Sequence, residues 1–304
     1  MPPSMVRVLA AVEKGRGAGH HKNTSLVVVN SHHNASMTAE LAVALAACAA
    51  KRLHVGDDQL RGADWTGRGV WLPGAPTPVP VLEQLLLAGR TAVVVGLGAV
   101  GKRVAVALAG LGTRVKATSR SASKKATKTT LAGVVPGLAV DVETYPAADL
   151  VGLLKDAALV VLCVPLVAET EGLFDDAAFD AMRPDAILVN VARGPVVDEH
   201  ALHRALESKK IAAYAADVWW NYPRTWADAG SGATPPSLEY DWAAAHPKAA
   251  LLFSPHRGGA MNVPGVDAAL SEALAVALTN AARHGVAEGL PTSPLARVDL
   301  AAGY

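Results

Sequence analysis

The chain has 304 residues, 51% of them hydrophobic and 18% charged, so it can form one large core or two modest ones and is not a disordered protein. Its formal net charge of +1 argues against a nucleic-acid partner, because such binders concentrate lysine and arginine. No run of about 18 residues is apolar without charges or glycines, which argues against a membrane span. Cys48 and Cys163 both lie in apolar segments, so free thiols and a cytoplasmic location are expected.

Three segments near the amino terminus have distinctive patterns. The β-branched run Ser25–Asn30 predicts a strand, and the alanine- and leucine-rich run Met37–Arg52 predicts a long helix. Because this helix is apolar nearly all round, we expect it to be buried, as it would be in the subunit interface of a homodimer. Leu72–Pro80 contains four prolines, which exclude a helix or a central strand, and it predicts a domain boundary.

From Thr91 onward, strand-like segments alternate with helical ones, which is typical of an α/β fold with a doubly wound parallel sheet. The predicted strands are Thr91–Val95, Arg114–Thr118, Ala158–Cys163, Ala186–Val191, Ala212–Val218 and Ala249–Phe253. We assign residues 76–259 to this sheet domain. Residues 1–75, together with residues 260–304, are assigned to a second domain.

A glycine-rich loop directly follows the first strand of this series. The segment GLGAVG at residues 96–101 fits the G-x-G-x-x-G pattern and opens a helix, which is the context that a dinucleotide site requires. Gly96 permits a tight turn, Gly98 lets the backbone approach a pyrophosphate, and Gly101 allows close helix packing. The N–H groups near Ala99 and Val100, at the positive end of the helix, would bind the phosphates. The alternative is a glycine-rich turn without a ligand.

The end of the second strand selects the cofactor. NAD binders place an acidic residue about 20 residues after the glycine loop, where it bonds the ribose 2′-hydroxyl. In this chain that position is Ser119, followed by Arg120, Ser121 and two lysines, with no carboxylate to repel a 2′-phosphate. The pattern therefore favours NADP, with NAD as the second choice. The alternative is a solvated, lysine-rich loop.

Two further segments place candidate catalytic side chains directly after apolar strands. Arg193 precedes a Gly-Pro turn at the end of the strand Ala186–Val191, where open α/β folds hold their ligands. Its planar guanidinium suits a carboxylate beside a carbonyl better than a lysine would. His256 follows Ser254-Pro255, and an imidazole titrates near neutral pH, as an acid/base group must. For an isolated histidine, packing in a Pro-His turn would be the preferred interpretation; in this series of motifs it is not.

With these segments in place, the chain from Val27 to Tyr304 resembles the D-isomer-specific 2-hydroxyacid dehydrogenases, and within them the glyoxylate and hydroxypyruvate reductases. The segments that carry the resemblance are Ala39-Glu40, GLGAVG, Val164-Pro165-Leu166 with Glu169-Thr170, NVARGPVVDEHAL, Asp217-Val218 and SPHRGG. Their order and spacing agree with the family pattern. The resemblance implies a Rossmann domain and a second, flavodoxin-like domain that binds the substrate.

The resemblance also implies a chemistry. Hydride passes from the nicotinamide to a small 2-oxo acid, with glyoxylate or hydroxypyruvate expected, while His256 protonates the developing alkoxide. Arg193 would bind the substrate carboxylate, and Asp217 would hold the nicotinamide carboxamide. The further cofactor contacts that it implies are Val164, Pro165, Thr170, Val191, Ala192 and Gly258. Such hydride transfer needs no metal, and none is expected.

Two departures from the family pattern bear on activity. The family has a glutamate that pairs with the histidine five residues after the aspartate, and this chain has Tyr222 there. A tyrosine supplies no negative charge near neutral pH, so we expect a lowered pKa for His256, lowered further by Arg257. This predicts either weak catalysis or reduction that is best at mildly acidic pH. The second departure is a short amino-terminal region, which predicts an abbreviated flavodoxin-like domain.

These departures keep an alternative open, in which the protein is a nucleotide-binding scaffold or sensor whose catalysis has decayed. The intact Arg193, His256 and Asp217 argue against it. A formate-type oxidation is disfavoured, because the glutamine that would polarise the histidine is absent.

Overall fold

The structure, a computed structural model, describes residues 29–31, 34–67, 84–122, 125–230, 232, 234–259 and 295–297. The chain divides into two compact units, Ala35–Ala260 in one and Met1–Asn34 with Met261–Tyr304 in the other. In the latter, the described part is an antiparallel pair of strands, β1 (Val29–Ser31) and β10 (Leu295–Arg297). Of the residues predicted to form the flavodoxin-like domain, 35–67 lie in the larger unit, and most of the others lie outside the described residues.

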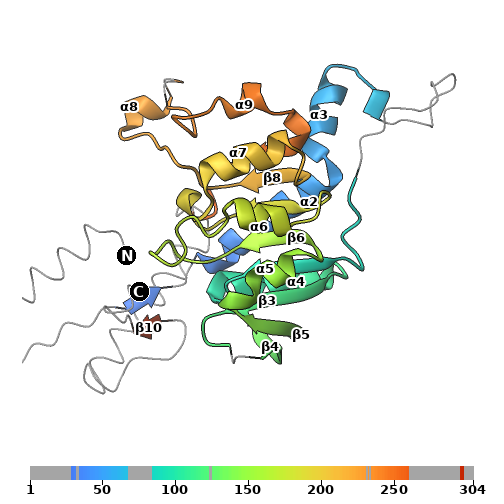
Figure 1. Ribbon diagram of the computed structural model, residues 1–304, viewed down its shortest axis with the longest axis vertical. Helices are drawn as coiled ribbons and strands as arrows, with labels where there is room; N and C mark the ends of the chain where they lie inside the picture. Colours follow the sequence, from blue (N-terminus) through green and yellow to red (C-terminus); the bar gives the residue numbers. More distant parts are fainter. Residues whose placement is uncertain are drawn as a thin grey trace, which may run out of the picture. The chain divides into compact units, whose positions relative to one another are not determined.

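The larger unit is built on an eight-stranded sheet with the strand order β4-β5-β3-β2-β6-β7-β8-β9, in which only β4 is antiparallel to its neighbour (Figure 1). The strands are β2 (Thr91–Val95), β3 (Arg114–Ser119), β4 (Thr127–Val135), β5 (Leu138–Pro146), β6 (Ala157–Leu162), β7 (Ile187–Asn190), β8 (Ala213–Ala216) and β9 (Leu251–Phe253). The doubly wound α/β sheet and its six predicted strands are therefore confirmed. The sequence analysis missed the hairpin β4–β5.

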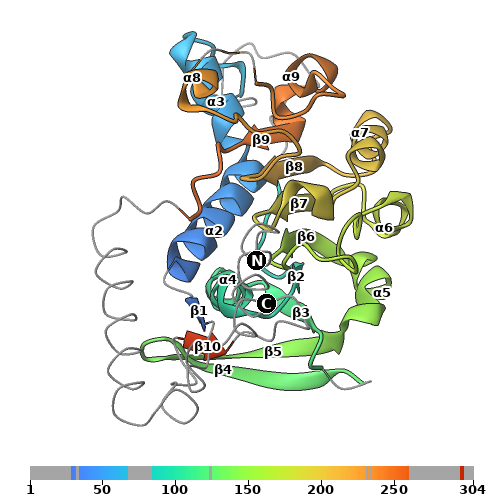
Figure 2. The same ribbon diagram turned by 90° about the vertical axis from the view of Figure 1, so that its left-hand side faces the viewer.

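Helices cover both faces of the sheet (Figure 2). The helices of this unit are α2 (Ala35–Lys51), α3 (Leu53–Arg61), α4 (Ala99–Gly110), α5 (Leu150–Leu154), α6 (Asp176–Ala181), α7 (Glu199–Glu207), α8 (Trp226–Ala229) and α9 (Trp242–Ala245). Short 3₁₀ turns occur at Ala147–Asp149, Gly194–Val196 and Lys248–Ala250. One buried cluster joins α2 and α4 to the sheet, and the other joins it to α5, α6 and α7. None of the helices within the described residues is long and apolar enough to cross a membrane.

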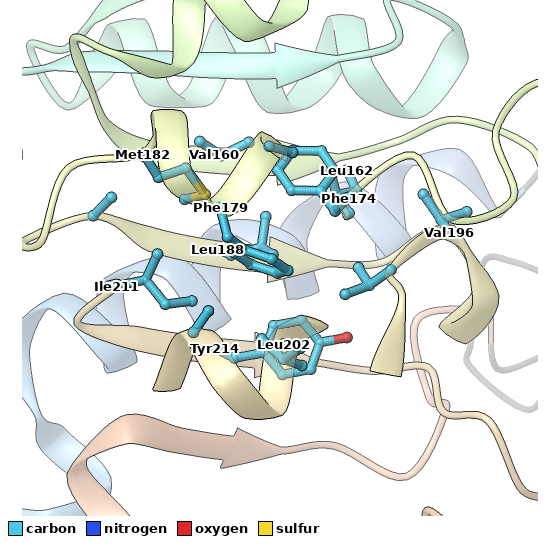
Figure 3. Packing of buried hydrophobic residues seen from close by; sticks show 14 of the residues in the cluster. Val160, Leu162, Phe174, Phe179, Met182, Leu188, Val196, Leu202, Ile211 and Tyr214 are labelled. Atoms are coloured by element: carbon cyan, nitrogen blue, oxygen red, sulfur yellow. The ribbon is translucent and has the colours of Figure 1, made fainter. Parts of the chain in front are cut away.

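The central strands are apolar on both faces because each face is covered by helices. In β2, Val93 belongs to one buried cluster, while Ala92 and Val94 belong to the other, as the alternation of side chains along a strand requires. Figure 3 shows one of these clusters, in which Phe174, Phe179, Leu188, Leu202 and Tyr214 pack together. This packing fixes the sheet on which the loops at the strand ends are carried.

The long alanine-rich helix predicted over Met37–Arg52 is confirmed as α2. Its small residues Ala39, Ala42 and Ala46 are buried in the cluster that also contains residues of α4 and β7. The burial that its sequence predicts is thus met within this chain, in the same unit as the sheet. A homodimer stays a prediction, as does the assignment of residues 1–75 with 260–304 to a second domain.

Candidate active site

One row of paired residues crosses the sheet close to the carboxyl ends of its parallel strands. The row consists of Thr118, Val95, Leu162, Asn190, Ala216 and Phe253. The residues that directly follow it are Ser119, Gly96, Cys163, Val191, Asp217 and Ser254. Every segment that the sequence analysis assigned to cofactor or substrate therefore starts at the same edge of the sheet, where α/β folds bind their ligands.

The glycine loop lies where the strand order reverses, between β2 and β6. Gly96 has a φ of 95°, which a side chain would strain, and a Cβ there would lie 2.8 Å from a methyl group of Val164. A Cβ at Gly101 would collide with the Gly96 carbonyl oxygen, whereas one at Gly98 would meet no atom within 4 Å. Gly96 and Gly101 are therefore required by packing, and Gly98 leaves open space beside the helix start.

That open space fits a pyrophosphate. Gly98 is the residue before α4 and has no side chain to cap the first N–H groups of the helix, which starts at Ala99. Uncapped N–H groups and the positive end of the helix together attract phosphates. The loop thus has both the clearance and the donors that a dinucleotide requires.

At the end of β3, the hydroxyl groups of Ser119 and Ser121 lie 3.0 Å apart. The backbone N–H of Ser121 also donates to the Ser119 hydroxyl, at 3.3 Å. Arg120 between them is exposed. Ser123 and Lys124 lie outside the described residues. The described turn therefore presents hydroxyl groups and a cation, which suit a phosphate.

The loop after β6 is held by one side chain. The Thr170 hydroxyl donates to the Pro165 carbonyl at 2.6 Å and accepts from the Val167 N–H at 2.9 Å. These bonds close the segment that follows Val164, the residue that contacts Gly96. Thr170, predicted as a cofactor contact, thereby shapes the wall beside the glycine loop.

The turn that carries Arg193 is held by hydrogen bonds to the side chain of Asn190, which is completely buried. The Asn190 amide donates to the Arg193 carbonyl at 3.0 Å and to the Tyr214 hydroxyl at 3.2 Å, while its oxygen accepts from the Ala192 N–H at 3.0 Å. Val191 and Ala192 are buried, so the exposed Arg193 side chain leaves a rigid base. Its guanidinium donates to the Ala192 carbonyl at 2.6 Å and keeps further N–H groups for a substrate carboxylate.

His256 has a φ of 57°, in the left-handed region that histidine adopts only uncommonly. Such backbone conformations cluster at functional sites. Loss of water around the imidazole lowers the pKa of His256; the charge on Asp217 opposes this, and the cation of Arg193 lowers the pKa further. The lowered pKa agrees with the expectation from the sequence, but the cation responsible is Arg193 and not Arg257.

Tyr222 lies against His256, with ring centroids 5.3 Å apart and the planes tilted by 52°. The Tyr222 hydroxyl accepts a hydrogen bond from the Trp219 N–H at 2.9 Å. Among the described residues, no hydrogen bond joins this hydroxyl to the imidazole. Tyr222 is therefore a packing neighbour of the histidine and not its hydrogen-bond partner.

Asp217 is 2% exposed, and its carboxylate accepts hydrogen bonds from the loop after β9. One oxygen accepts from the Ser254 hydroxyl at 2.5 Å and from the Arg257 N–H at 2.8 Å, and the other accepts from the Gly258 N–H at 2.7 Å. A carboxylate can accept about four hydrogen bonds, so these three leave the capacity for one more.

The sequence analysis missed Asn190 and Ser254 as parts of this site. Asn190 is a polar residue in an otherwise apolar strand, a signal that could have indicated a buried bonding role. Ser254 carried no such signal, because its bond to Asp217 joins residues that are far apart in the sequence. Within the described residues, no group of His, Cys, Asp and Glu side chains is arranged to hold a metal ion.

The chain is similar in sequence to a known enzyme family and to characterised members of it. Residues 43–258 match the family model for the D-isomer specific 2-hydroxyacid dehydrogenase, NAD binding domain. The glyoxylate reductase of Thermococcus onnurineus is 35% identical over 201 residues, which is 66% of this chain and 53% of that protein. The D-3-phosphoglycerate dehydrogenase of Archaeoglobus fulgidus is 33% identical over 199 residues, which is 65% of this chain and 33% of that protein. The chain thus spans about half the length, or less, of these curated relatives.

Two solved structures show the same fold. A probable 2-hydroxyacid dehydrogenase from Rhizobium etli, in complex with NADP, is similar with a TM-score of 0.62 and 21% identity, covering 94% of this chain and 75% of that one. The D-lactate dehydrogenase of Lactobacillus jensenii, with NAD+, is similar with a TM-score of 0.63 and 22% identity, covering 88% of this chain and 72% of that one.

Proposed function

Since the chain belongs to the D-isomer specific 2-hydroxyacid dehydrogenase family, we propose that it transfers a hydride between NADP(H) and a small 2-oxo acid. We propose glyoxylate or hydroxypyruvate as the substrate, on the similarity to glyoxylate reductases. One observation carries the proposal: the glycine loop and the segments that carry Arg193 and His256 all follow strands that end at one edge of the sheet.

In the proposed reaction, the nicotinamide would supply or accept the hydride when bound, and the chain's residues bind the reactants, stabilise charge and transfer the proton. The glycine loop and the start of α4 hold the pyrophosphate. Arg193 binds the substrate carboxylate and stabilises the negative charge that grows on the carbonyl oxygen. His256 gives its proton to that oxygen, so that hydride and proton together convert the 2-oxo acid to a 2-hydroxy acid.

The proposed preference for NADP is supported by the turn after β3. Ser119 and Ser121 present hydroxyl groups there, and Arg120 is exposed between them. A 2′-phosphate would gain charge-assisted hydrogen bonds at this turn, and no carboxylate stands where NAD binders have one.

The direction of the pH dependence follows from the pKa of His256. Reduction needs the protonated imidazole, and the protonated fraction falls as the pH rises through the pKa. Because burial and Arg193 lower this pKa below its ordinary value of 6.5, reduction should be fastest on the mildly acidic side.

The test is NADPH consumption by the purified chain over a panel of small 2-oxo acids, at mildly acidic and neutral pH, with NADH in parallel. We expect turnover with glyoxylate or hydroxypyruvate, a higher kcat/KM with NADPH than with NADH, and less activity at neutral pH. Turnover that prefers NADH would refute the cofactor assignment, and turnover confined to other 2-oxo acids would refute the substrate assignment.

One observation favours a second candidate function, a nucleotide-binding protein without chemistry. The Tyr222 hydroxyl is bonded to the Trp219 N–H, so the charged partner that the family gives its histidine is missing. A chain that binds NADPH tightly in a fluorescence titration, yet reduces no 2-oxo acid at any pH, would establish this second function and exclude the first.

A further inference from the structure

The backbone of Arg257 and Gly258, directly after His256, is held from two sides. On one side, the N–H groups of Arg257 and Gly258 donate to the Asp217 carboxylate at 2.8 Å and 2.7 Å. On the other side, the Thr38 hydroxyl in the first turn of α2 donates to the Gly258 carbonyl at 2.7 Å. Asp217 and Thr38 come from different parts of the sequence and both bond to this loop.

We propose that Thr38 is a positioning residue, which clamps the loop after β9 against Asp217 and so fixes His256 for proton transfer. The proposal rests on the proposed function, because it assigns Thr38 a part in the reaction of that site. Nothing in the sequence pattern of α2 indicates this part, since a threonine in the first turn of a helix ordinarily caps or packs.

The clamp has a physical task. His256 has a φ of 57°, so its backbone conformation persists only where the surroundings enforce it. Gly258 is close to both arms of the clamp: a Cβ there would lie 2.9 Å from an Asp217 carboxylate oxygen and 3.4 Å from the Thr38 methyl group. A side chain at position 258 would therefore crowd both Asp217 and α2.

The attachment through Thr38 is a single hydrogen bond, so one substitution can remove it. Asp217 makes three bonds to the loop, whereas the carbonyl of Gly258 accepts its bond from Thr38 on the side of α2. Removal of the Thr38 hydroxyl leaves the loop bonded to Asp217 and removes its hydrogen bond to α2. A displacement of about 1 Å at an acid/base group lowers a rate by as much as about 100-fold.

Three variants test the clamp. Thr38→Val removes the hydroxyl and keeps the shape, and Thr38→Ser restores a hydroxyl. Thr113→Val is the matched control, because the Thr113 hydroxyl likewise donates to a backbone carbonyl, that of Leu108 at 2.9 Å, after the end of α4. We expect Thr38→Val to lower kcat about ten-fold with little change in the KM for NADPH. Thr38→Ser should recover most of the rate, and Thr113→Val should lower thermal stability without lowering kcat.

A second readout does not depend on turnover. The imidazole of His256 can be titrated by NMR, with its signal identified by its absence in His256→Asn. In Thr38→Val the loosened loop should let water reach the ring, so the pKa of His256 should rise towards its ordinary value of 6.5. The groups that act on this ring are Asp217, Arg193 and Tyr222, which all three variants retain.

The two readouts separate the failure of this proposal from that of the proposed function. If the wild-type chain reduces no 2-oxo acid, the proposed function fails, and the titration of His256 still decides whether Thr38 holds the loop. If Thr38→Val keeps both the wild-type kcat and the wild-type titration of His256, the clamp is refuted. An equal loss of kcat in Thr113→Val would show a general effect on stability and would refute it as well.

Discussion

At His256, the ionisation of the imidazole depends on burial and on two nearby charged groups, Asp217 and Arg193. The imidazole lies beside the Tyr222 ring; burial lowers its pKa, the charge on Asp217 opposes this, and the nearby positive charge of Arg193 lowers the pKa further. A glutamate at position 222 would counter both effects, because an anion favours the protonated imidazole. A tyrosine in place of a glutamate at this position should therefore lower the pKa of the histidine, so that it carries its proton only at lower pH.

The first prediction concerns this pair. Tyr222→Glu should raise the pKa of His256 and move the high-pH limb of the kcat/KM profile upward by about one pH unit, because it adds an anion beside the ring. Tyr222→Phe is the control. Since the Tyr222 hydroxyl is bonded to the Trp219 N–H and not to the imidazole, its loss should leave the limb nearly in place. A limb that moves in Tyr222→Phe and not in Tyr222→Glu would contradict the arrangement.

The second prediction concerns cofactor choice. Ser119→Asp should raise the KM for NADPH by about ten-fold or more, because a carboxylate repels a 2′-phosphate, and it should lower the KM for NADH by offering the ribose a hydroxyl acceptor. Initial rates with each cofactor measure both effects. If the ratio of the two kcat/KM values is unchanged, the turn after β3 does not select the cofactor.

At the scale of elements, the turn between β2 and α4 contains one glycine that packing requires, Gly101, and one that we expect only the cofactor to require, Gly98. A Cβ at Gly101 would strike the Gly96 carbonyl oxygen, whereas a Cβ at Gly98 meets no protein atom. Gly101→Ala should therefore lower the melting temperature markedly, since the start of α4 must move away from β2. Gly98→Ala should keep the wild-type melting temperature and weaken NADPH binding at least about ten-fold, because only the ligand needs that space. Circular dichroism and a fluorescence titration test this third prediction, and equal melting temperatures in the two variants would count against it.

A second element-scale feature is the attachment of α9 to α7. His246, which is 6% exposed, has its Nε2 2.9 Å from Nδ1 of His203 on α7, and Trp242 donates to Glu199 at 3.2 Å. Burial and then the proximity of His203 lower the pKa of His246, against a smaller opposing effect of Glu207. A hydrogen bond between two imidazoles needs one of them neutral, so protonation of both would break it.

The fourth prediction follows from the sign of that shift. Because the pKa of His246 is lower in the folded state than its ordinary value of 6.5, the folded protein binds fewer protons than the unfolded chain in the window below 6.5. The free energy of unfolding should therefore fall as the pH drops through that window. Urea unfolding at about pH 7.5 and about pH 5.5 measures the fall, which should be smaller in His246→Gln. An unchanged fall in the variant would show that other groups cause it.

At the scale of the whole molecule, stability comes from the two apolar faces of one sheet. Leu188 in β7 is completely buried between Phe179 and Tyr214 in the cluster of Figure 3. As a fifth prediction, Leu188→Ala should lower the free energy of unfolding by about 2–5 kcal/mol, because it leaves a cavity in a close-packed core. Leu238→Ala, at a side chain 79% exposed, should change it by less than about 0.5 kcal/mol. Denaturant unfolding of both variants measures the contrast, and similar losses would contradict the assigned core.

The sequence predicted this molecule best where one segment alone determines the outcome. Buried strands such as Ile187–Asn190 are mostly apolar runs, and the glycine loop is recognised by the spacing of its three glycines. The hairpin of β4 and β5 was missed because most of its side chains are exposed and include polar residues such as Lys128 and Thr130. An edge hairpin of this kind lacks the apolar run by which the other strands were found.

The site divides in the same way. Arg193 and His256 could be found because each follows an apolar strand within a recognisable segment. The bonds that hold them could not, since the partner of Asp217 at Ser254 and the partner of Gly258 at Thr38 lie far away in the sequence. Only the folded sheet brings such pairs together. The hydrogen bonds that position a catalytic group are therefore the part of a site that cannot be predicted from a single sequence.

The central claim is that this sheet edge binds a nicotinamide cofactor and uses His256 as its proton donor. The most direct measurement compares His256→Asn with the wild-type chain for both NADPH binding and NADPH-dependent reduction of glyoxylate or hydroxypyruvate. We predict that the variant binds NADPH with wild-type affinity and loses at least about 100-fold in kcat, which is the usual contribution of a general acid. A variant that keeps the wild-type kcat would contradict the account, because the proton would then come from another group.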